Sequence, residues 1–412
     1  MSFPRYPKYK ASGVEWLGDV PEHWDVHRLR FIAELNPSKS EISQLARETV
    51  VSFLPMESVG DDGTLSLDKE KTIGEVESGY TYFRDGDVTV AKITPCFENS
   101  KGALMCGLAN GIGFGTTELI VVRPRPDELL GSYLHFLFIS TEFRGLGESH
   151  MYGAGGQKRV PDAFVRNFAT AFPPVTEQTA IAAFLDRETG KIDELVAEQR
   201  RLIELLKEKR QAVISHAVTK GLNPHAPTKP SGIEWLGDVP EHWEVRKLSY
   251  LFRAGKGKNG QTLTKEYCAE NEGDYPVYSG QTENEGVMAT WNQFEFDFEN
   301  DGVLFSTTVG AKAMHLKHLR GKFSLSQNCM IIWPTDQRCG VRFFYYHFQP
   351  LFQFERGLIP EHMQASFRVE DLYRYLIAVP PIEEQSAITT FLDRETAQLD
   401  ALTAEADRKS VV

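Results

Sequence analysis

The sequence has few features of a membrane protein, a disulfide-bonded protein or a metalloprotein. No apolar run approaches the roughly 18 residues that a membrane span needs, and the first residues lack the apolar segment of a secretory signal. The sequence therefore predicts a cytoplasmic protein. The five cysteines are an odd number and widely spaced, which indicates reduced, buried thiols rather than disulfides or a zinc clip.

Familiar catalytic motifs are absent as well. There is no G-x-x-x-x-G-K-[ST] phosphate loop, no H-E-x-x-H zinc motif and no G-x-S-x-G nucleophile turn. Residues 255–260 fit G-x-G-x-x-G, but no apolar-periodic helix follows, so a basic loop near phosphates is the better interpretation. His315 and His318 have no carboxylate or cysteine at metal-ligand spacing. We expect that the chain holds no metal site and is not an enzyme. The alternative is that it is an enzyme whose catalytic site has no recognisable motif.

The chain has fewer basic than acidic residues. Lys and Arg number 45 against 57 Asp and Glu, a net charge of −12, which argues against nucleic acid as a partner because phosphate contacts need cations. The basic residues nevertheless collect locally, since residues 253–265 and residues 306–322 each contain four Lys or Arg and no acid. These stretches favour a local nucleic-acid surface; two solvated loops are the alternative.

Internal repetition is what the sequence has in abundance. A segment that we call box A, Ser12–Leu29, recurs as Ser231–Leu248 with 14 of 18 positions identical. A second segment, box B, Pro173–Arg201, recurs as Pro380–Arg408 with 17 of 29 identical. Four of the six tryptophans lie in box A, and their repetition favours a packing role over base stacking. The order is box A, variable region, box B, written twice.

The two variable regions, Arg30–Phe172 and Ser249–Val379, differ strongly. They share weak similarities in short apolar runs that are typical of strands. Residues 87–90 are matched with residues 302–305, and residues 118–124 with residues 328–334. Many glycines and short apolar runs predict mainly β domains with a few helices, for example over residues 129–143 and 342–349. Two related folds with different surfaces explain this pattern.

Box B predicts a long helix. From Glu177 to Thr219 no proline occurs and Gly190 is the only glycine, while Gly221 and Pro224 supply a stop. Apolar residues recur every three or four positions, and the second copy repeats the stripe, so the two helices are expected to pair as an antiparallel coiled coil. The alternative is that each helix packs on its own domain. The residues assigned to this spine or to a partner interface are Leu185, Ile192, Leu195, Leu202, Leu206, Val213, Leu392, Leu399 and Leu402.

These residues carry a family resemblance. Box A with Val-Pro-Glu-His-Trp, and box B with Pro-Pro-x-x-Glu-Gln followed by Phe-Leu-Asp-Arg-Glu-Thr, resemble the repeats of the specificity subunit of type I restriction-modification enzymes. In the first variable region, residues 91–99, 113–118 and 155–161 are similar to one group of target recognition domains in that family. In the second, residues 278–282, 307–310 and 324–327 are similar to another.

The resemblance implies an α+β fold in which two mainly β target recognition domains are joined by long α-helices that form an antiparallel coiled-coil spine with pseudo-two-fold symmetry. The expected organisation is an N-terminal repeat box (1–29), target recognition domain 1 (30–172), a central repeat region with the long helix and the second box A (173–248), target recognition domain 2 (249–379) and a truncated distal repeat helix (380–412).

The resemblance also implies a function. Each recognition domain is expected to read one half of a bipartite, asymmetric double-stranded DNA site, while the helices set the gap and dock two methyltransferase subunits. Motor-nuclease restriction subunits would complete the complex, and S-adenosylmethionine, ATP and Mg would bind to these partners rather than to this chain. A two-lobed scaffold that binds proteins but no DNA is the alternative.

Polar side chains beside glycines are the candidates for DNA contact, because they can approach bases and phosphates closely. In the first domain they are Lys92, Thr94, Asn99, Lys101, Thr116, Thr117, Gln157, Lys158 and Arg159. In the second they are Lys256, Lys258, Ser279, Gln281, Thr307, Thr308, Lys312, Gln327 and Gln364. Gln157 and Gln364 rank first because they occupy equivalent positions relative to box B.

The second box B is followed by fewer residues than the first, so counterparts of Leu206 and Val213 are missing from its stripe. Compared with the repeat pattern of that family, in which the second box B resembles the first over more of its length, the chain resembles a truncated specificity subunit. Such a chain is expected to bind DNA through both domains and to recruit the second methyltransferase subunit poorly.

The repeat generates a prediction about modularity. Replacing residues 30–172 with the corresponding region of another family member should change one half of the methylated DNA motif and preserve the other half, because the boxes are shared and the inserts differ. Sequencing of methylated bases in cells that carry the chimera measures this. A change in both halves would contradict independent readers.

Overall fold

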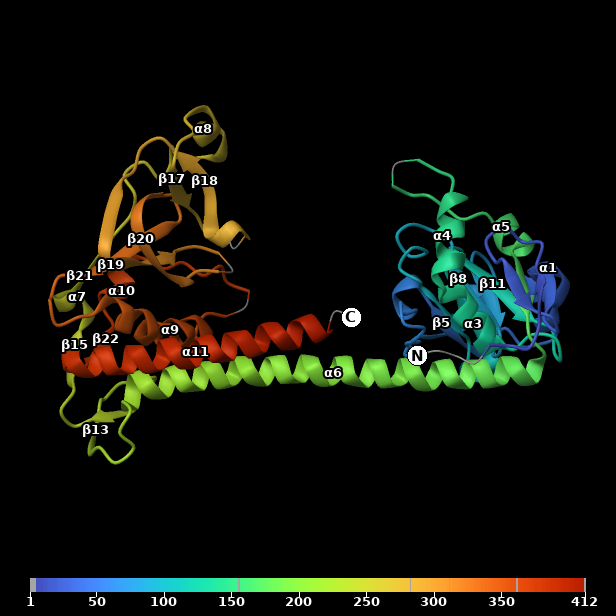
Figure 1. The fold of residues 1–412 in the computed structure, drawn as a ribbon, viewed down its shortest axis with the longest axis horizontal. Helices are drawn as coiled ribbons and strands as arrows, with labels where there is room; N and C mark the ends of the chain where they lie inside the picture. The colour runs from blue at the N-terminus through green and yellow to red at the C-terminus, as the bar shows by residue number, and fades with distance from the viewer. Residues whose placement is uncertain (1–4, 155, 282, 311, 361, 411–412) are drawn as a thin grey trace. The chain divides into compact units, whose positions relative to one another are not determined.

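The computed structural model describes residues 5–154, 156–281, 283–310, 312–360 and 362–410. The chain divides into two units, the first ending at Asp193 and the second beginning at Glu194 (Figure 1). Each unit combines sheets with helices, as the α+β prediction requires. No helix in the described part of the chain is long and apolar enough to cross a membrane.

The first unit contains two four-stranded sheets, ordered β6-β5-β10-β7 and β4-β11-β8-β9, and two two-stranded ones, β1-β2 and β3-β12. Its strands are β1 (Tyr9–Ala11), β2 (Asp19–Pro21), β3 (Asp25–Arg28), β4 (Ala33–Leu35), β5 (Val50–Leu54), β6 (Glu70–Thr72), β7 (Thr81–Arg84), β8 (Val88–Ala91), β9 (Gly102–Leu104), β10 (Ile112–Gly115), β11 (Leu119–Pro124) and β12 (Ala169–Phe172). Its α-helices are α1 (Leu29–Ile32), α2 (Ile73–Val76), α3 (Gly131–Ile139), α4 (Thr141–Ser149) and α5 (Asp162–Asn167), with α6 (Val175–Lys220) continuing into the second unit. Short 3-10 helices are η1 (Lys39–Ile42), η2 (Met56–Ser58) and η3 (Ala109–Gly111).

The second unit is built on one six-stranded sheet, ordered β16-β21-β19-β20-β17-β18, and two two-stranded ones, β13-β14 and β15-β22. Its strands are β13 (Thr228–Pro230), β14 (Asp238–Pro240), β15 (Glu244–Lys247), β16 (Phe252–Gly255), β17 (Tyr275–Tyr278), β18 (Val287–Trp291), β19 (Phe296–Thr307), β20 (Leu316–Leu325), β21 (Cys329–Pro334) and β22 (Leu376–Val379). Its helices are α7 (Leu248–Leu251), α8 (Lys265–Glu270), α9 (Val341–Gly357), α10 (Val369–Leu372) and α11 (Ile382–Ser410), together with the 3-10 helix η4 (Glu283–Gly286).

The duplication seen in the boxes extends into the variable regions. Strand β11 pairs antiparallel with β8 in the first unit, and β21 pairs with β19 in the same way in the second. The predicted match of residues 118–124 with 328–334 is confirmed, because Leu119 and Cys329 occupy the same position in these ladders. The other predicted match was wrong by one residue, since Ala91 corresponds to Thr307.

The helix predictions hold with two adjustments. The long helix predicted over residues 177–219 is confirmed as α6, and Gly221 ends it with a φ of 74°. The helix predicted over residues 129–143 is instead α3 and α4, because the Ser140 side chain accepts a hydrogen bond from the Phe143 N–H and starts a new helix. Helix α9 starts as predicted but continues past Pro350 to Gly357.

In each unit a buried glutamine joins box B to the variable region. Gln178 accepts a hydrogen bond from the Leu130 N–H and donates to the carbonyls of Glu128 and Pro173, at 2.8–2.9 Å. Gln385 makes the same three bonds, with the Gly340 N–H and the carbonyls of Arg338 and Pro380. Both amides are almost fully buried, so in each unit they fix the start of the long helix to the preceding strand and to the loop before a helix.

A glutamate beside each glutamine binds box A. Trp24 Nε1 donates to Glu177 at 3.3 Å and His23 Nε2 lies 2.9 Å from the same carboxylate, which also accepts from the Tyr6 hydroxyl. In the second unit Trp243 Nε1 donates to Glu384 at 3.0 Å, with His242 Nε2 at 2.7 Å. The predicted packing role of the box A tryptophans is confirmed.

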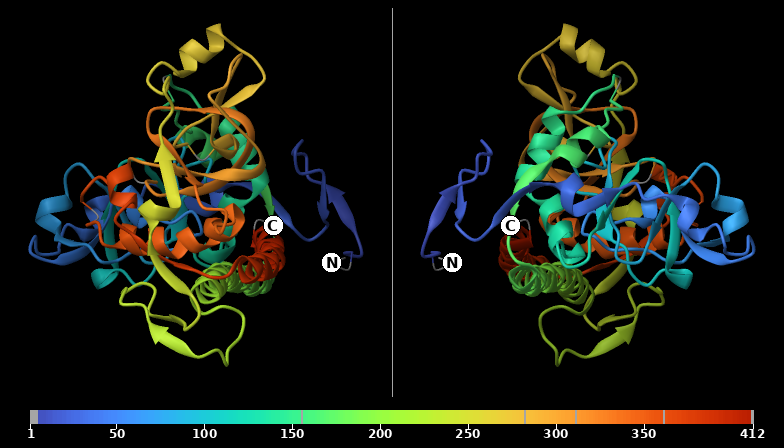
Figure 2. Two further views of the ribbon diagram at one scale, coloured as in Figure 1. Left: turned by 90° about the vertical axis from the view of Figure 1, so that its left-hand side faces the viewer. Right: turned by 90° about the vertical axis from the view of Figure 1, so that its right-hand side faces the viewer.

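Helices α6 and α11 pair antiparallel within the second unit. Arg210 of α6 forms a 2.8 Å ion pair with Asp400 of α11, and Gly221, past the end of α6, lies against Glu384 at the start of α11. The two helices are seen side by side in both views of Figure 2. The predicted antiparallel pairing is therefore confirmed for this part of α6.

The residues buried between α6 and α11 agree only in part with the predicted apolar stripe. Leu392 and Leu399 are buried as predicted, and Leu206 and Val213 are half-buried. Leu202 and Leu402 are 43% and 51% exposed, so they do not pack in the spine and stay predicted partner contacts. Ile203, next to Leu202, is buried instead. Ile192 and Leu195 are exposed and Leu185 is half-buried, which leaves them as predicted partner contacts.

The buried glutamines generate a stability prediction. Gln385→Leu should lower the free energy of unfolding of the second unit by about 1–3 kcal/mol, because the Gly340 N–H and two carbonyls lose their partners in a dry site. Urea unfolding measures the loss. The exposed Gln398→Leu on the same helix is the matched control and should change stability little; equal effects of the two substitutions would contradict the prediction.

Glu177 generates a pH prediction. Partial burial raises the pKa of Glu177, but hydrogen bonds from Tyr6, His23 and Trp24 outweigh it and leave the pKa below the ordinary 4.5. Its contribution to stability is therefore present above pH 4.5 and is lost as the pH falls through the lowered pKa. Glu177→Gln should lower the unfolding temperature at pH 7, and the difference from wild type should shrink in acid. The exposed Glu198→Gln is the control, and a pH-independent difference would argue against ionised Glu177.

Candidate nucleic-acid interface

Three segments of the first unit meet just beyond the end of β8. The Lys92 N–H donates to the Glu118 carbonyl at 2.8 Å, and the Val160 N–H donates to the Lys92 carbonyl at 2.8 Å. The Thr94 N–H then donates to the Lys158 carbonyl at 3.0 Å. Residues 92–94 are thus held between residue 118 and residues 158–160, and we call this arrangement the junction.

The second unit contains the same junction. The Thr308 N–H donates to the Asn328 carbonyl at 2.9 Å, the Phe367 N–H donates to the Thr308 carbonyl at 2.7 Å, and the Gly310 N–H donates to the Ala365 carbonyl at 3.0 Å. The backbone bonding pattern is therefore the same in both units.

The side chains on this shared backbone differ completely. Lys92, Glu118 and Arg159 in the first unit correspond to Thr308, Asn328 and Ser366 in the second. Gln157 and Gln364 are the exception, because both precede the third segment and both are exposed. A fixed backbone with exchanged side chains is suited to reading two different targets in one geometry.

In the first unit the junction contains an arginine that is paired with a glutamate, and exposed polar side chains lie next to this pair. Arg159 Nε and Nη2 contact the Glu118 carboxylate at 2.8–3.3 Å, and these bonds hold the pKa of Glu118 below its usual value. Lys158 and Gln157 are exposed next to this pair. The site therefore offers a lysine and an amide at its surface, with Arg159 held in a defined orientation.

In the second unit an open hollow of about 720 Å³ adjoins the junction, lined in part by Gly310, Arg356, Met363 and Gln364. Cations gather nearby. Partial burial lowers the pKa of His315, and the charges of Lys317, Lys312 and Arg356 lower it further. A locally positive surface is the consequence, as the acid-free stretch over residues 306–322 predicts.

Comparison with known proteins gives consistent matches. Residues 240–408 match the family described as the type I restriction modification DNA specificity domain. The specificity subunit of the EcoEI type I restriction enzyme of Escherichia coli is 43% identical over 200 residues, 48% of this chain and 33% of that protein. The putative specificity subunit MjaX of Methanocaldococcus jannaschii is 22% identical over 90% of this chain and 86% of its own length.

Solved structures agree on the fold. A chain from a type I R-M system superposes with a TM-score of 0.75 at 17% identity, covering 95% of this chain and 94% of that chain. The HsdS subunit from Thermoanaerobacter tengcongensis superposes with a TM-score of 0.57, also at 17% identity, over 95% of each chain.

The chain is thus similar to type I specificity subunits, and residues 240–408 match the DNA specificity domain of that family. The Escherichia coli relatives are matched over only about a third of their length, so what those whole proteins do is a proposal for this chain. Among the residues that the structure describes, no cluster of His, Cys, Asp or Glu has the arrangement of a metal site.

The structure brings most first-unit candidates to the junction. Lys92, Thr94, Gln157, Lys158 and Arg159 belong to it, and Thr116 and Thr117 lie in the turn that leads into residue 118. Lys101 points away, because its ammonium group contacts the Met56 carbonyl at 3.3 Å and Asp61 at 4.0 Å. Asn99 is exposed on the turn after β8.

The second-unit candidates divide into exposed and buried residues. Lys256, Lys258, Lys312, Gln327 and Gln364 are exposed, and Gln281 is half-buried, donating to the Val287 carbonyl at 2.7 Å. Ser279, Thr307 and Thr308 are buried, which corrects the prediction that they are surface contacts. The Thr307 hydroxyl accepts from the His315 N–H at 3.0 Å and bonds the Lys312 carbonyl, so it shapes the loop that presents Lys312.

Sequence reasoning missed the exposed apolar side chains of the junction. Tyr152, which pairs with Arg159 through backbone bonds, is 63% exposed, and Met363 is 58% exposed. Both lie in variable loops, where no periodic pattern separates a buried apolar residue from an exposed one.

The junction generates a prediction about specificity. Gln157→Ala and Gln364→Ala should relax base preference in opposite halves of the recognised site, each by about tenfold, because an amide that bonds a base edge discriminates by about 1–3 kcal/mol. Binding to a library of DNA duplexes measures the preference. Gln398→Ala, exposed on α11, is the control. If both variants relaxed the base preference in the same half of the site, Gln157 and Gln364 would not read opposite halves and the prediction would be wrong.

Proposed function

We propose that the chain is the DNA sequence-specificity subunit of a type I restriction-modification complex, and that each junction reads one half of a bipartite, asymmetric site. The observation that carries this proposal is the repeated junction, in which three identical backbone hydrogen bonds support different side chains in the two units. A reader of two unlike half-sites needs equal geometry and unequal chemistry. The match of residues 240–408 to a DNA specificity domain supports the same function.

Within that complex the chain itself carries out no chemistry. Two methyltransferase subunits would bind S-adenosylmethionine and methylate adenine, and motor-nuclease subunits would use ATP and Mg²⁺. The partner-facing residues would include Ile192 and Leu195, which are exposed apolar residues on α6. Exposed apolar side chains on a long helix are suited to packing against a partner.

Salt dependence of DNA binding tests the proposal. The full chain should bind duplex DNA that contains its site, and affinity should fall steeply as salt rises, because bound phosphates release counterions. Fluorescence anisotropy at several salt concentrations measures this. A chain that binds no DNA at any salt concentration but still captures proteins would support the alternative, a protein-binding scaffold.

The continuous helix α6 generates a prediction about spacing. Inserting one helical turn of residues after Ala197 should lengthen the gap in the recognised site and preserve both half-site sequences, because α6 runs from the first unit into the second. Methylated-base sequencing measures motif and gap together. Loss of motif identity with an unchanged gap would refute the role of α6 as the spacer.

A further inference from the structure

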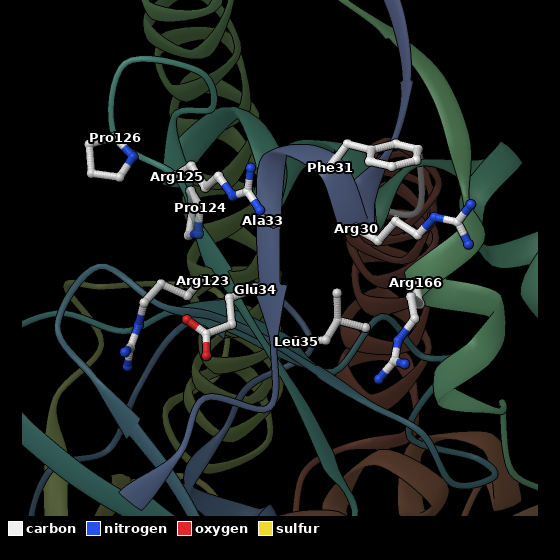
Figure 3. Close-up of a pocket in the computed structure, with 10 residues that line it drawn as sticks. All are labelled: Arg30, Phe31, Ala33, Glu34, Leu35, Arg123, Pro124, Arg125, Pro126 and Arg166. Carbon is white, nitrogen blue, oxygen red and sulfur yellow. The ribbon is translucent and has the colours of Figure 1, made fainter. Parts of the chain in front are cut away.

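A pocket of about 560 Å³ lies in the first unit at the far end of β11 from the junction (Figure 3). Strand β11 begins directly after Glu118 of the junction and ends at Arg123 and Pro124, which line the pocket. Six residues of strand span about 20 Å. The pocket is therefore separate from the surface proposed to read DNA.

Arginines dominate the lining, and three of them lack a carboxylate partner. Arg123 is compensated, because Asp87 binds it through two bonds of 2.6 and 2.8 Å and Glu41 binds it at 2.5 Å. Among the described residues, Arg30, Arg125 and Arg166 form no ion pair. Arg30 donates instead to the neutral Asn167 side chain at 2.8 Å. Glu34 also lines the pocket, so the three arginines outnumber one carboxylate and the pocket is net positive in a chain of net charge −12.

An exposed aromatic ring stands at the edge of this charge. Phe31 is 54% exposed, and the Arg30 guanidinium lies 4.8 Å from its ring centre. In Figure 3 the side chains of Arg30 and Arg166 lie on the same side of the pocket as Phe31. Arginine and aromatic side chains together are enriched at protein interfaces and often carry most of their binding energy.

The second unit keeps the aromatic residue and loses the arginines. Tyr250 occupies the position of Phe31 relative to box A and is 75% exposed. The strand pair that places Glu34 opposite Arg123 places Arg253 opposite Trp333 in the second unit. The aromatic position is thus common to both units, whereas the arginine cluster belongs to the first.

We propose that the pocket around Arg30, Arg125 and Arg166 docks an acidic segment of a methyltransferase subunit, with Phe31 as the apolar anchor. This rests on the proposed function, which supplies a protein partner in two copies. In the second unit Tyr250 is the corresponding apolar anchor for the second methyltransferase copy, which binds there without an arginine cluster. The two docking positions are therefore unequal, and the one on the first unit is the more sensitive to salt.

Reversal of the charge tests the proposal. In the double variant Arg30→Glu/Arg166→Glu, the affinity of the full chain for the methyltransferase subunit of its own system should fall at least tenfold at about 0.15 M salt, where charges interact over roughly 8 Å. Native mass spectrometry should show fewer bound copies than for the wild-type chain. DNA affinity of the chain alone should stay within about twofold of wild type.

The control is Lys8→Glu/Lys69→Glu, which makes the same change in net charge at exposed lysines outside the pocket and should bind as many copies as the wild-type chain. Phe31→Ala and Arg30→Gln/Arg166→Gln provide milder variants, and circular dichroism confirms their fold. They should also weaken the first docking position.

Two results would overturn the proposal. Unchanged methyltransferase binding by all pocket variants would show that the pocket does not dock this partner. A loss of DNA affinity with intact methyltransferase binding would identify the pocket as a phosphate contact. Neither result touches the proposed function, which fails if the wild-type chain binds no DNA.

Discussion

A Glu-Gln pair in the first turn of each long helix is the contact on which the rest of the structure depends. Glu177 and Glu384 bind the His-Trp pair of box A, and Gln178 and Gln385 bind three backbone groups around them. The glutamine amides are buried, so the unmet hydrogen bonds would be costly if either side of the contact changed. The glutamate contacts with His and Trp explain why box A and box B are repeated together. The glutamines bind backbone groups of the variable regions, whose side chains can therefore differ.

The variable regions keep a backbone and exchange its side chains. The β8-β11 and β19-β21 ladders lead into junctions with the same three hydrogen bonds, yet Glu118 is replaced by Asn328 and Arg159 by Ser366. Backbone hydrogen bonds do not depend on side-chain identity, so the scaffold tolerates such exchange. The two units therefore share one backbone geometry at the junction and carry different side-chain chemistry on it.

The two ends of β11 have different properties. Its start carries exposed polar groups of the junction, whereas its end carries the arginines and the exposed ring of Phe31. One strand thus links the surface proposed to read DNA with the surface proposed to receive a partner. Such a rigid connection keeps the two surfaces of one unit at a constant separation, because strands in a packed sheet change length little.

The sequence alone determined the duplicated organisation, the long helices, their antiparallel pairing and the resemblance to type I specificity subunits, because the boxes repeat at constant offsets and helical periodicity is a local property. Only the tertiary structure decided the equivalence of the junctions, since residues 92, 118 and 158 correspond to residues 308, 328 and 365 at three different offsets. It also decided that Thr307 and Thr308 are buried, that Ile203 rather than Leu202 packs in the spine, and that Arg30, Arg125 and Arg166 share one pocket. Burial and convergence depend on long-range packing, which neither composition nor periodicity encodes.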